Sequence, residues 1–386
     1  MTDTMDKEEK AKIVAGLQDI VITEQDICYI DGQNGRVIYR GYDINDLARN
    51  ATFEEVCYLL WHGDLPTSEQ LDELNNQLFE AMTLPPEIYE ILRALPKNAE
   101  PMRVLEVAVA ALGMVDPEAN DEAEASNQHK ALRLTAQLPV ITTAWHRIRN
   151  DQEPIAATAG KSLAYNFLKM LRGEEPDEYA VDTLDAALVL HADHELNAST
   201  FAARVTAATL SDFHSAVVSA IGTLKGPLHG GANEAVMKML EEIGTPENVE
   251  PWLEKYLEQG NKIMGFGHRV YRTKDPRAKI LEVMSEELGK RTGQTKWYEM
   301  SRRVEAAFQP KVAAKGIFPN VDFYSASAYE AMGIPHDLFT PIFACSRISG
   351  WSAHLLEQYA DNRLIRPTSD YIGPTDLKWK PIDERG

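Results

Sequence analysis

The chain has 386 residues, of which 44% are hydrophobic and 25% are charged, so it is globular and can bury a sizeable core. This length favours two lobes, or one large domain with a smaller partner. The 59 acidic and 39 basic residues give a net charge of −20. That charge argues against general binding to nucleic acids or anionic membranes, which both need a broad basic face, but it permits a small anion in a local basic pocket.

The cysteines and the N-terminus indicate the compartment. Three cysteines, Cys28, Cys57 and Cys345, lie far apart without CxxC spacing, which fits a reducing environment better than a disulfide framework or a zinc ribbon. The start MTDTMDKEEK lacks the apolar core of a signal peptide. The best apolar run, 104–115, contains a glutamate and is shorter than the span of about 20 residues that a bilayer needs. We therefore expect a cytoplasmic protein.

A strand signal appears near the N-terminus. The apolar segment 27–30 is followed by the glycine-containing stretch 31–35 and then by a second apolar segment, 36–39. Alternating strands around a short glycine-containing loop are typical of a β-hairpin.

Helical spacing dominates the rest of the chain. A capping-box pattern at 67–70 opens one amphipathic segment, and two prolines at 85–86 stop it. The runs 186–190 and 202–208 are apolar on more than one side, which indicates helices packed deep in a bundle. The acidic stretch 116–124 is expected to be a solvated loop. The sequence thus predicts a mainly α protein.

Two seams containing glycine and proline, 226–231 and 333–335, bracket about a hundred residues, which is a usual domain size. They predict a small helical domain over 231–333, and a large helical domain built from 1–230 plus 334–386. Hinges near the seams would let one lobe close on the other.

Four segments concentrate residues that exchange protons or bind anions. In the first, HADHE, His191 and His194 are spaced so that they would share one helix face. With Glu195 they could hold a metal, although the pattern is not HExxH, and a polar network at a helix end is the alternative.

The second segment, KGPLHGGANEA, places His229 just before a helical pattern. The positive end of a helix disfavours imidazolium, so this ring is expected to be neutral at pH 7 and able to donate a hydrogen bond to an oxyanion. A capping or packing histidine is the alternative.

The third segment, 262–279, is basic although the chain as a whole is acidic. Its only acidic residue is Asp275, and its six basic residues are Lys262, Arg269, Arg272, Lys274, Arg277 and Lys279. Arginines bind carboxylates and phosphates through bidentate forks, so an anion pocket is reasonable. A solvated basic loop is the alternative. GFGHRV lacks the full GxGxxG pattern of a dinucleotide fold.

In the fourth segment, Asp322 precedes helical spacing, which makes it a candidate N-cap. A partly buried cap carboxylate is also a plausible base. Arg347 and Arg366, nearer the C-terminus, would each be an ordinary surface charge if taken alone.

Together these segments resemble the citrate synthase family. Residues 265–277 fit the family signature G-[aromatic]-G-H-x-V-x-R-x-x-D-P-R at every position, and HADHE, GPLHGGANE, NVDFYSA and SRISGW resemble the surrounding family blocks in the same order. The resemblance covers nearly the whole chain, and the length suits the short prokaryotic branch. It implies a nearly all-α, two-lobe dimer that opens with a small β-hairpin.

The resemblance also implies a role for each candidate residue. Asp322 would remove a methyl proton from acetyl-CoA, His229 would hydrogen-bond the thioester oxygen, and His268 would polarise the carbonyl of oxaloacetate. His194, Arg277 and Arg347 would bind the carboxylates of oxaloacetate and citrate. Arg366 would reach in from the second subunit of a homodimer. Contacts with CoA would come from Arg272, Gly265 and Gly267.

The implied enzyme is an acyltransferase of the tricarboxylic acid cycle, with no metal and no cofactor beyond the CoA substrate. One alternative is 2-methylcitrate synthase, which uses propionyl-CoA with the same residues. Alternatives of other classes are a metal-dependent hydrolase built on His191, His194 and Glu195, and a non-catalytic helical interaction protein.

Overall fold

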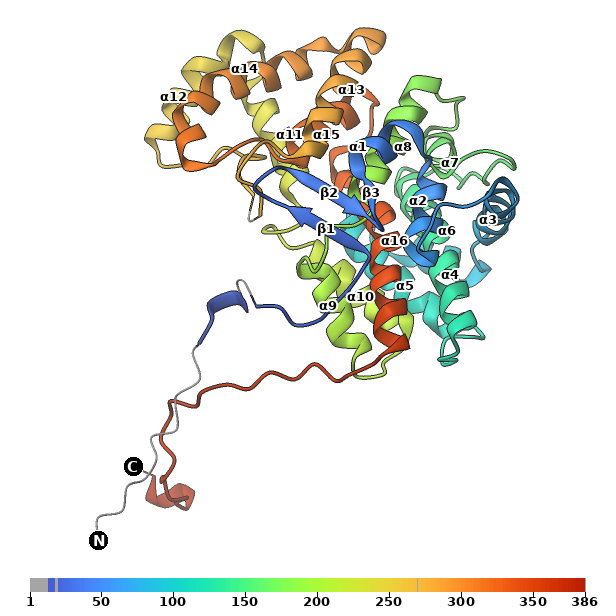
Figure 1. The fold of residues 1–386 in the computed structure, drawn as a ribbon, viewed down its shortest axis with the longest axis vertical. Coiled ribbons are helices and arrows are strands. Elements are labelled where there is room, and N and C mark those ends of the chain that lie inside the picture. Colours follow the sequence, from blue (N-terminus) through green and yellow to red (C-terminus); the bar gives the residue numbers. More distant parts are fainter. Residues whose placement is uncertain (1–12, 18–19, 269, 386) are drawn as a thin grey trace.

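The computed structural model describes residues 13–17, 20–268 and 270–385, and this part of the chain contains sixteen α-helices and one small sheet (Figure 1). The predicted mainly α class is therefore confirmed. Within the described residues, no helix is both long enough and apolar enough to cross a membrane.

The sheet has three antiparallel strands in the order β1 (Cys28–Asp31), β2 (Arg36–Tyr39) and β3 (Tyr42–Asp43). The predicted hairpin is confirmed, with Cys28 opposite Tyr39 and Asp31 opposite Arg36. The sequence did not reveal β3, because a strand of two residues is too short to show alternation.

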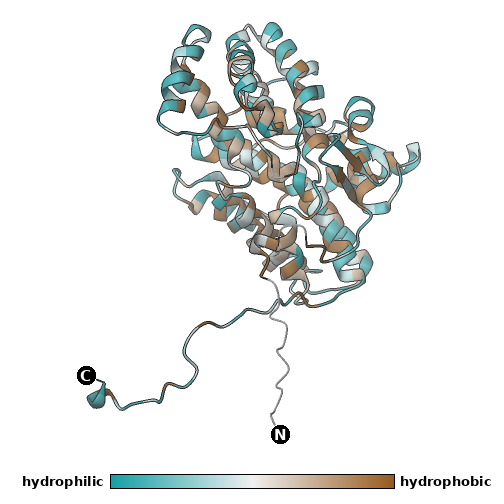
Figure 2. Ribbon diagram, turned by 60° about the vertical axis from the view of Figure 1, so that its left-hand side comes forward, coloured by the Kyte–Doolittle hydropathy of each residue, from teal (hydrophilic) through white to brown (hydrophobic). Residues whose placement is uncertain are grey.

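Eleven helices form the larger part of the molecule, and α16 runs through its middle, where it packs against α2, α6, α8, α9 and α10. Hydrophobic residues concentrate on the inner helices and hydrophilic ones outside (Figure 2). Trp351 of α16 is fully buried, as are Ile348 and Ala344. These helices are α1 (Ile44–Asn50), α2 (Phe53–His62), α3 (Ser68–Ala81), α4 (Pro86–Ala94), α5 (Pro101–Val115), α6 (Glu124–Arg149), α7 (Leu163–Arg172), α8 (Glu178–His191), α9 (Ala198–Ala207), α10 (Phe213–Leu224) and α16 (Phe339–Ala360).

The five remaining helices pack chiefly on one another at the upper left of Figure 1. They are α11 (Ala232–Ile243), α12 (Val249–Glu258), α13 (Pro276–Thr292), α14 (Thr295–Val312) and α15 (Val321–Ala331). Helix α13 also contacts α8, and α11 contacts α16. The division into lobes at 231 and 333 stays a prediction. Short 3-10 helices lie at Ala15–Leu17, Pro246–Asn248, Ala313–Lys315, His336–Leu338 and Ile382–Glu384.

Local signals set several helix ends. Thr67 caps α3, and the side chain of Gln70 closes the predicted capping box. The acidic stretch 116–124 is a mostly exposed loop up to the start of α6, as expected, but two of its acids are held in place. Arg133 of α6 pairs with Asp116 at 2.7 Å and with Glu118 at 2.6 Å, which ties the loop to the helix.

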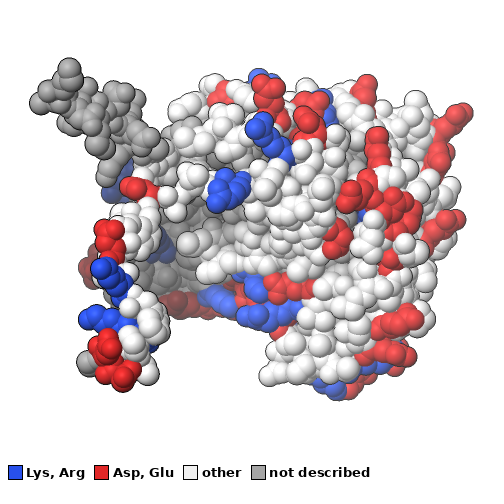
Figure 3. Space-filling model, turned by 90° about the horizontal axis from the view of Figure 1, so that it is seen from below, with Lys and Arg blue, Asp and Glu red and all other residues white. Residues whose placement is uncertain are grey.

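Charge is unevenly spread over the surface. Seen from below, Asp and Glu lie along one side of the body, whereas Lys and Arg form a smaller group near its middle (Figure 3). The acidic surplus thus belongs to the outer surface.

Candidate active site

Loops and helix ends from distant parts of the chain bring six candidate residues together. His194 follows α8, His229 lies between α10 and α11, and His268 lies in the loop before α13. Arg277 stands in the first turn of α13, Asp322 in the first turn of α15 and Arg347 inside α16. The rings of His194 and His268 lie 5.1 Å apart, edge to face.

The first predicted motif does not form a helix face, so that expectation was wrong. Helix α8 ends at His191 with Ala192 as its C-cap, and His194 lies in the turn beyond. His191 Nδ1 bonds the carbonyl oxygen of Ala187 at 2.7 Å. Among the described residues, no group of three or more His, Cys, Asp or Glu side chains could hold a metal ion, so His191, His194 and Glu195 form no such cluster.

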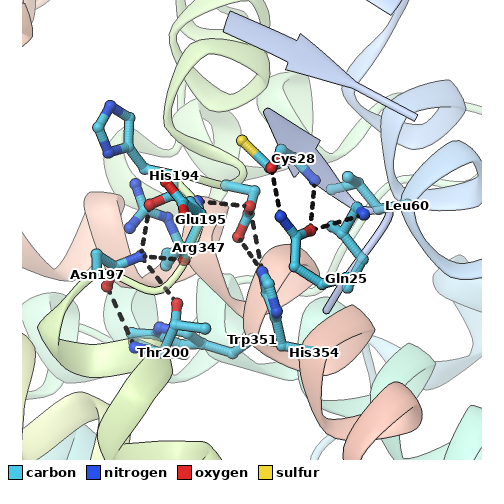
Figure 4. Close-up of polar contacts among 12 residues, drawn as sticks. Gln25, Cys28, Leu60, His194, Glu195, Asn197, Thr200, Arg347, Trp351 and His354 are labelled. Carbon is cyan, nitrogen blue, oxygen red and sulfur yellow. Dashed lines mark hydrogen bonds and ion pairs between the residues drawn. The ribbon is translucent and has the colours of Figure 1, made fainter. Parts of the chain in front are cut away.

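The turn that carries His194 is held by polar contacts (Figure 4). Asn197 caps α9 by accepting from the backbone N–H groups of Ser199 and Thr200, and its amide donates to Thr200 Oγ1 at 2.8 Å. Asp193 belongs to this turn and pairs with His354 of α16 at 3.3 Å, with both side chains buried, and the Asp193 carboxylate accepts from the Glu195 N–H at 3.0 Å. Helix α8 therefore stops because its next residues are fixed in another conformation.

His194 is buried, and its Nε2 lies 3.0 Å from the hydroxyl of Tyr271. Burial, together with the positive charges of Arg277 and Arg347, lowers the pKa of His194 well below its usual value. This imidazole is therefore neutral at pH 7.

His229 is held by Ser199. Its Nε2 lies 2.8 Å from Ser199 Oγ and 3.3 Å from the Ser199 backbone nitrogen, and Trp351 donates to the same hydroxyl at 3.1 Å. Burial and the nearby charge of Arg347 lower the pKa of His229 to about 4. The expected neutral ring is present, and burial and Arg347 account for the lowered pKa.

His268 is oriented by its own loop. Its Nδ1 accepts from the backbone N–H groups of Val270 at 3.0 Å and Tyr271 at 3.3 Å. Nδ1 therefore carries no proton, and the proton of the neutral ring sits on Nε2. Burial and the charge of Arg277 lower the pKa of His268 to about 4, although Asp275 opposes the shift.

Asp322 is not the N-cap of α15, so that expectation was wrong. Asn320 caps the helix by accepting from the Asp322 N–H at 3.1 Å, and its amide donates to the Gly267 carbonyl at 3.1 Å. Asp322 is buried, and its Oδ1 has no hydrogen-bond partner. Burial raises the pKa of Asp322 to about 7, while Arg277 and Arg347 oppose the rise.

The two arginines of the site are buried. For Arg347 this differs from the exposed surface charge that its sequence position, taken alone, suggested. Arg277 holds Asp275 through Nε at 3.0 Å and Nη2 at 2.7 Å. Arg347 Nε donates to the carbonyl of His191 at 2.7 Å, and its guanidinium lies 4.7 Å from the centre of the Phe343 ring. Both guanidinium groups keep donors for an anionic ligand.

The basic run before α13 is not one pocket, so that expectation was wrong in part. Lys274 pairs with Glu282 at 2.6 Å and with Glu305 at 2.7 Å, two acids from outside the run. Lys262, Arg272 and Lys279 are exposed, and Arg269 lies outside the described residues. Among the described basic residues of the run, Arg277 is the one buried beside the histidines.

The predicted CoA contacts lie in the loop that carries His268. Gly265 has a φ of +75°, and a Cβ there would lie 2.9 Å from Phe323, so only glycine fits. Gly267 has a φ of +90° and donates its N–H to Phe318 at 2.8 Å. Arg272 is exposed on the same loop.

Arg366 is not brought to this cluster within the chain. It is exposed in the segment that follows α16, which leaves the body in Figure 1.

Reasoning from the sequence missed Ser199, Tyr271, Asn320 and Trp351. Asn197 has an N-cap pattern just before Ser199, and Tyr271 occupies a variable position of the signature. Neither signal indicates a contact with a distant histidine. Such contacts depend on tertiary structure.

Known proteins resemble this chain along most of its length. Residues 16–368 match the family model "Citrate synthase, C-terminal domain". The chain is 52% identical to citrate synthase 2 of Bacillus subtilis over 371 residues, which cover 96% of this chain and 98% of that protein. It is 42% identical to 2-methylcitrate synthase of Shewanella oneidensis, and the match covers 96% of this chain and 98% of that protein.

Among solved structures, citrate synthase from Thermoplasma acidophilum, in a ternary complex with carboxymethyl coenzyme A and oxaloacetate, superimposes with a TM-score of 0.91. It is 34% identical, and the match covers 97% of this chain and 100% of that one. The likeness holds along the whole length, in sequence and in fold, so this chain belongs to the citrate synthase family.

Proposed function

We propose that the chain condenses acetyl-CoA with oxaloacetate and then hydrolyses the citryl thioester to citrate and CoA. The observation that carries this proposal is Asp322, a buried carboxyl group with an unpartnered oxygen and a pKa of about 7. Neutral histidines and two arginines accompany it. A base whose pKa lies near the working pH is well suited to abstract a proton from carbon.

The first step makes the nucleophile. Asp322 takes a proton from the methyl group of acetyl-CoA, and the electron pair of that C–H bond moves toward the thioester oxygen. His229 stabilises this oxygen by donating from Nδ1, because Ser199 engages its Nε2. A positioned base and an oxyanion donor each contribute factors of about 10² to 10⁴.

The second step forms the carbon–carbon bond. The enol carbon attacks the keto carbon of oxaloacetate while His268 donates from Nε2 to the carbonyl oxygen. Arg277, Arg347 and His194 hold the carboxylates. Water then cleaves the citryl thioester. These side chains supply the base and the donors that the steps need, so we propose that no metal and no bound cofactor takes part.

The loop of Gly265, Gly267 and Arg272 is proposed to receive CoA, since Arg272 is exposed and a Cβ on Gly267 would meet only Ile317, at 3.9 Å, which lets a ligand approach the backbone there. Closure of the predicted small domain would keep water out until condensation is complete.

We further propose a homodimer in which Arg366 completes the site of the partner subunit. Arg366 is exposed in the segment that follows α16, and this segment leaves the body in Figure 1. Helix α5 exposes Val107, Met114 and Val115, with Met114 83% exposed, and an apolar helix face of this kind fits burial against a second copy. A cytoplasmic location is proposed from the three free, buried cysteines.

Use of propionyl-CoA is the second candidate, because 2-methylcitrate synthase is a relative. The greater identity to a citrate synthase favours acetyl-CoA. The test is to compare kcat/KM for both acyl-CoA substrates with oxaloacetate present. We expect acetyl-CoA to be preferred, and a preference for propionyl-CoA would contradict the proposal. One methylene is worth about 1 to 3 kcal/mol in a fitted pocket, so the difference is measurable.

A further inference from the structure

Tyr271 touches three of the residues proposed to bind oxaloacetate. Its hydroxyl lies 3.0 Å from His194 Nε2, and its ring centre lies 4.5 Å from that of His268. The guanidinium of Arg277 lies 5.8 Å from the centre of the same ring. The Tyr271 N–H also donates to His268 Nδ1. The side chain is only 1% exposed, so these contacts fix its position.

The hydroxyl of Tyr271 determines which nitrogen of His194 can donate. Burial raises the pKa of Tyr271, so the phenol keeps its proton. Among the described residues, His194 Nε2 is the acceptor within reach of that proton. When Nε2 accepts, the proton of the neutral imidazole sits on Nδ1, which can then donate to a ligand.

The other two histidines of the site follow the same pattern. His268 is engaged at Nδ1 by backbone N–H groups, and His229 is engaged at Nε2 by Ser199. In each ring the protein holds one nitrogen, so the other is left for substrate. Tyr271 is the side chain that serves His194 in this way.

We propose that Tyr271 is a positioning residue for oxaloacetate, which orients His194 through its hydroxyl and supports His268 through its ring. This inference rests on the function proposed above and names a residue that the recognised motif leaves variable. It requires the hydroxyl to help oxaloacetate bind without taking part in the transfer of the methyl proton.

The test is Tyr271→Phe, which keeps the ring and removes only the hydroxyl. We expect the KM for oxaloacetate and its Kd, measured by calorimetry without acyl-CoA, to rise about tenfold, equivalent to about 1.4 kcal/mol. The kcat and the KM for acetyl-CoA should stay within about threefold. A residue with a purely structural role would not separate the two KM values.

Tyr359→Phe is the matched control. In the unaltered protein the Tyr359 hydroxyl donates to the Ser211 carbonyl at 2.6 Å and touches none of the three histidines of the site. Tyr359→Phe therefore loses a hydrogen bond without altering substrate binding. We expect its melting temperature to fall and both KM values to match those of the unaltered protein.

Three results would overturn the inference. An unchanged Kd for oxaloacetate in Tyr271→Phe would show that the hydroxyl does not position His194. A lower Kd would show that the hydroxyl competes with substrate for Nε2. If the unaltered protein neither binds oxaloacetate nor turns over, the proposed function fails and the inference falls with it, whereas the first two results leave that function intact.

Discussion

At the scale of single residues, Asp322 gains its basicity from a balance of opposing effects. Burial disfavours the carboxylate, and the negative charge of Asp275 adds to that effect, while Arg277 and Arg347 stabilise it. The resulting pKa of about 7 leaves a large part of the carboxyl groups ionised at neutral pH. A base of this strength can take a proton from carbon and return to its starting state.

The dependence of activity on pH follows from this balance. The pKa values of His229 and His268 are about 4, so both rings stay neutral from pH 5 to pH 9. Only ionised Asp322 can act as base. We therefore expect kcat/KM for oxaloacetate at saturating acetyl-CoA to fall tenfold per pH unit below about pH 7 and to level off above it. A flat profile between pH 5 and pH 8 would contradict the assignment of the base.

The same shift predicts an effect on stability. Since the pKa of Asp322 rises from 3.8 to about 7 on folding, the folded protein binds the proton more tightly. Folding therefore loses stability as pH rises from about 4 through about 7. The amide in Asp322→Asn cannot titrate, so this variant lacks this loss of stability. As pH rises over this range, the free energy of unfolding of the variant should increase relative to that of the unaltered protein, by up to about 4 kcal/mol. Urea denaturation at pH 5 and pH 8 measures the change, and an equal difference at both pH values would refute it.

The sequence allowed the proposed catalytic residues to be named, but it did not predict their surroundings. His229, His268 and Asp322 lie in segments that combine glycine or helix-start signals with reactive side chains. Asp322 was mistaken for a cap because Asn320, two residues earlier, competes for the same role and has the better position. The burial of Arg347 could not be predicted, since it depends on how α16 packs.

At the scale of elements, the β-hairpin supports the loop of His268. The Gly32 carbonyl accepts from the Arg272 N–H at 2.9 Å, and a Cβ on Gly32 would lie 2.4 Å from the Val270 carbonyl oxygen. Val270 also donates to His268. The turn between β1 and β2 therefore helps to set the position of the His268 ring.

Gly32→Ala should displace this loop. We expect kcat/KM for oxaloacetate to fall about 10 to 100-fold, because small misplacements of reacting groups are costly. The control is Gly41→Ala in the same sheet, where φ is +92° and nothing lies within 4 Å of the added Cβ. It should lose about 1 to 3 kcal/mol of stability through backbone strain, with activity retained. If Gly32→Ala and Gly41→Ala have the same kcat/KM for oxaloacetate, the hairpin turn does not support the loop of His268.

Elements were easier to predict than their ends. The capping box of α3 and the strands β1 and β2 depend on local sequence, and they were predicted. The end of α8 was not, because Asp193 stops the helix by accepting from the Glu195 N–H and contacting His354, 161 residues later in the chain. A spacing argument cannot include such a partner.

At the scale of the whole molecule, Arg366 is proposed to reach the site of a second copy of the chain. The exposed apolar side chains of α5 offer a surface for that copy. In a two-fold dimer, each subunit would lend its Arg366 to the other. The role of Arg366 across a homodimer came from the family resemblance and not from periodicity, since an interface leaves no periodic signal of its own.

Mixed dimers test this exchange. Arg366→Ala and Asp322→Asn should each be nearly inactive alone. When the two are co-expressed, a mixed dimer contains one site with its own Asp322 and the Arg366 of its partner. Random pairing should restore about a quarter of full activity, since half of the dimers are mixed and each has one intact site. If co-expression restores no activity, Arg366 does not act across the interface.

The overall charge sets a condition for binding. The net charge of −20 repels the anionic substrates at a distance, so local groups must attract them at the site. Arg277 and Arg347 are buried beside neutral histidines, where solvent screens their charge least. These two arginines therefore supply the local attraction, although Arg277 is already paired with Asp275.

The most direct test of the account is the turnover of the unaltered protein beside Asp322→Asn, with acetyl-CoA and oxaloacetate as substrates and the released CoA and citrate measured. We predict that the unaltered protein forms one citrate per CoA released. The variant should bind oxaloacetate with an unchanged Kd while its kcat falls about 10² to 10⁴-fold. Near-normal turnover by the variant, or no release of CoA that depends on oxaloacetate by the unaltered protein, would contradict the account.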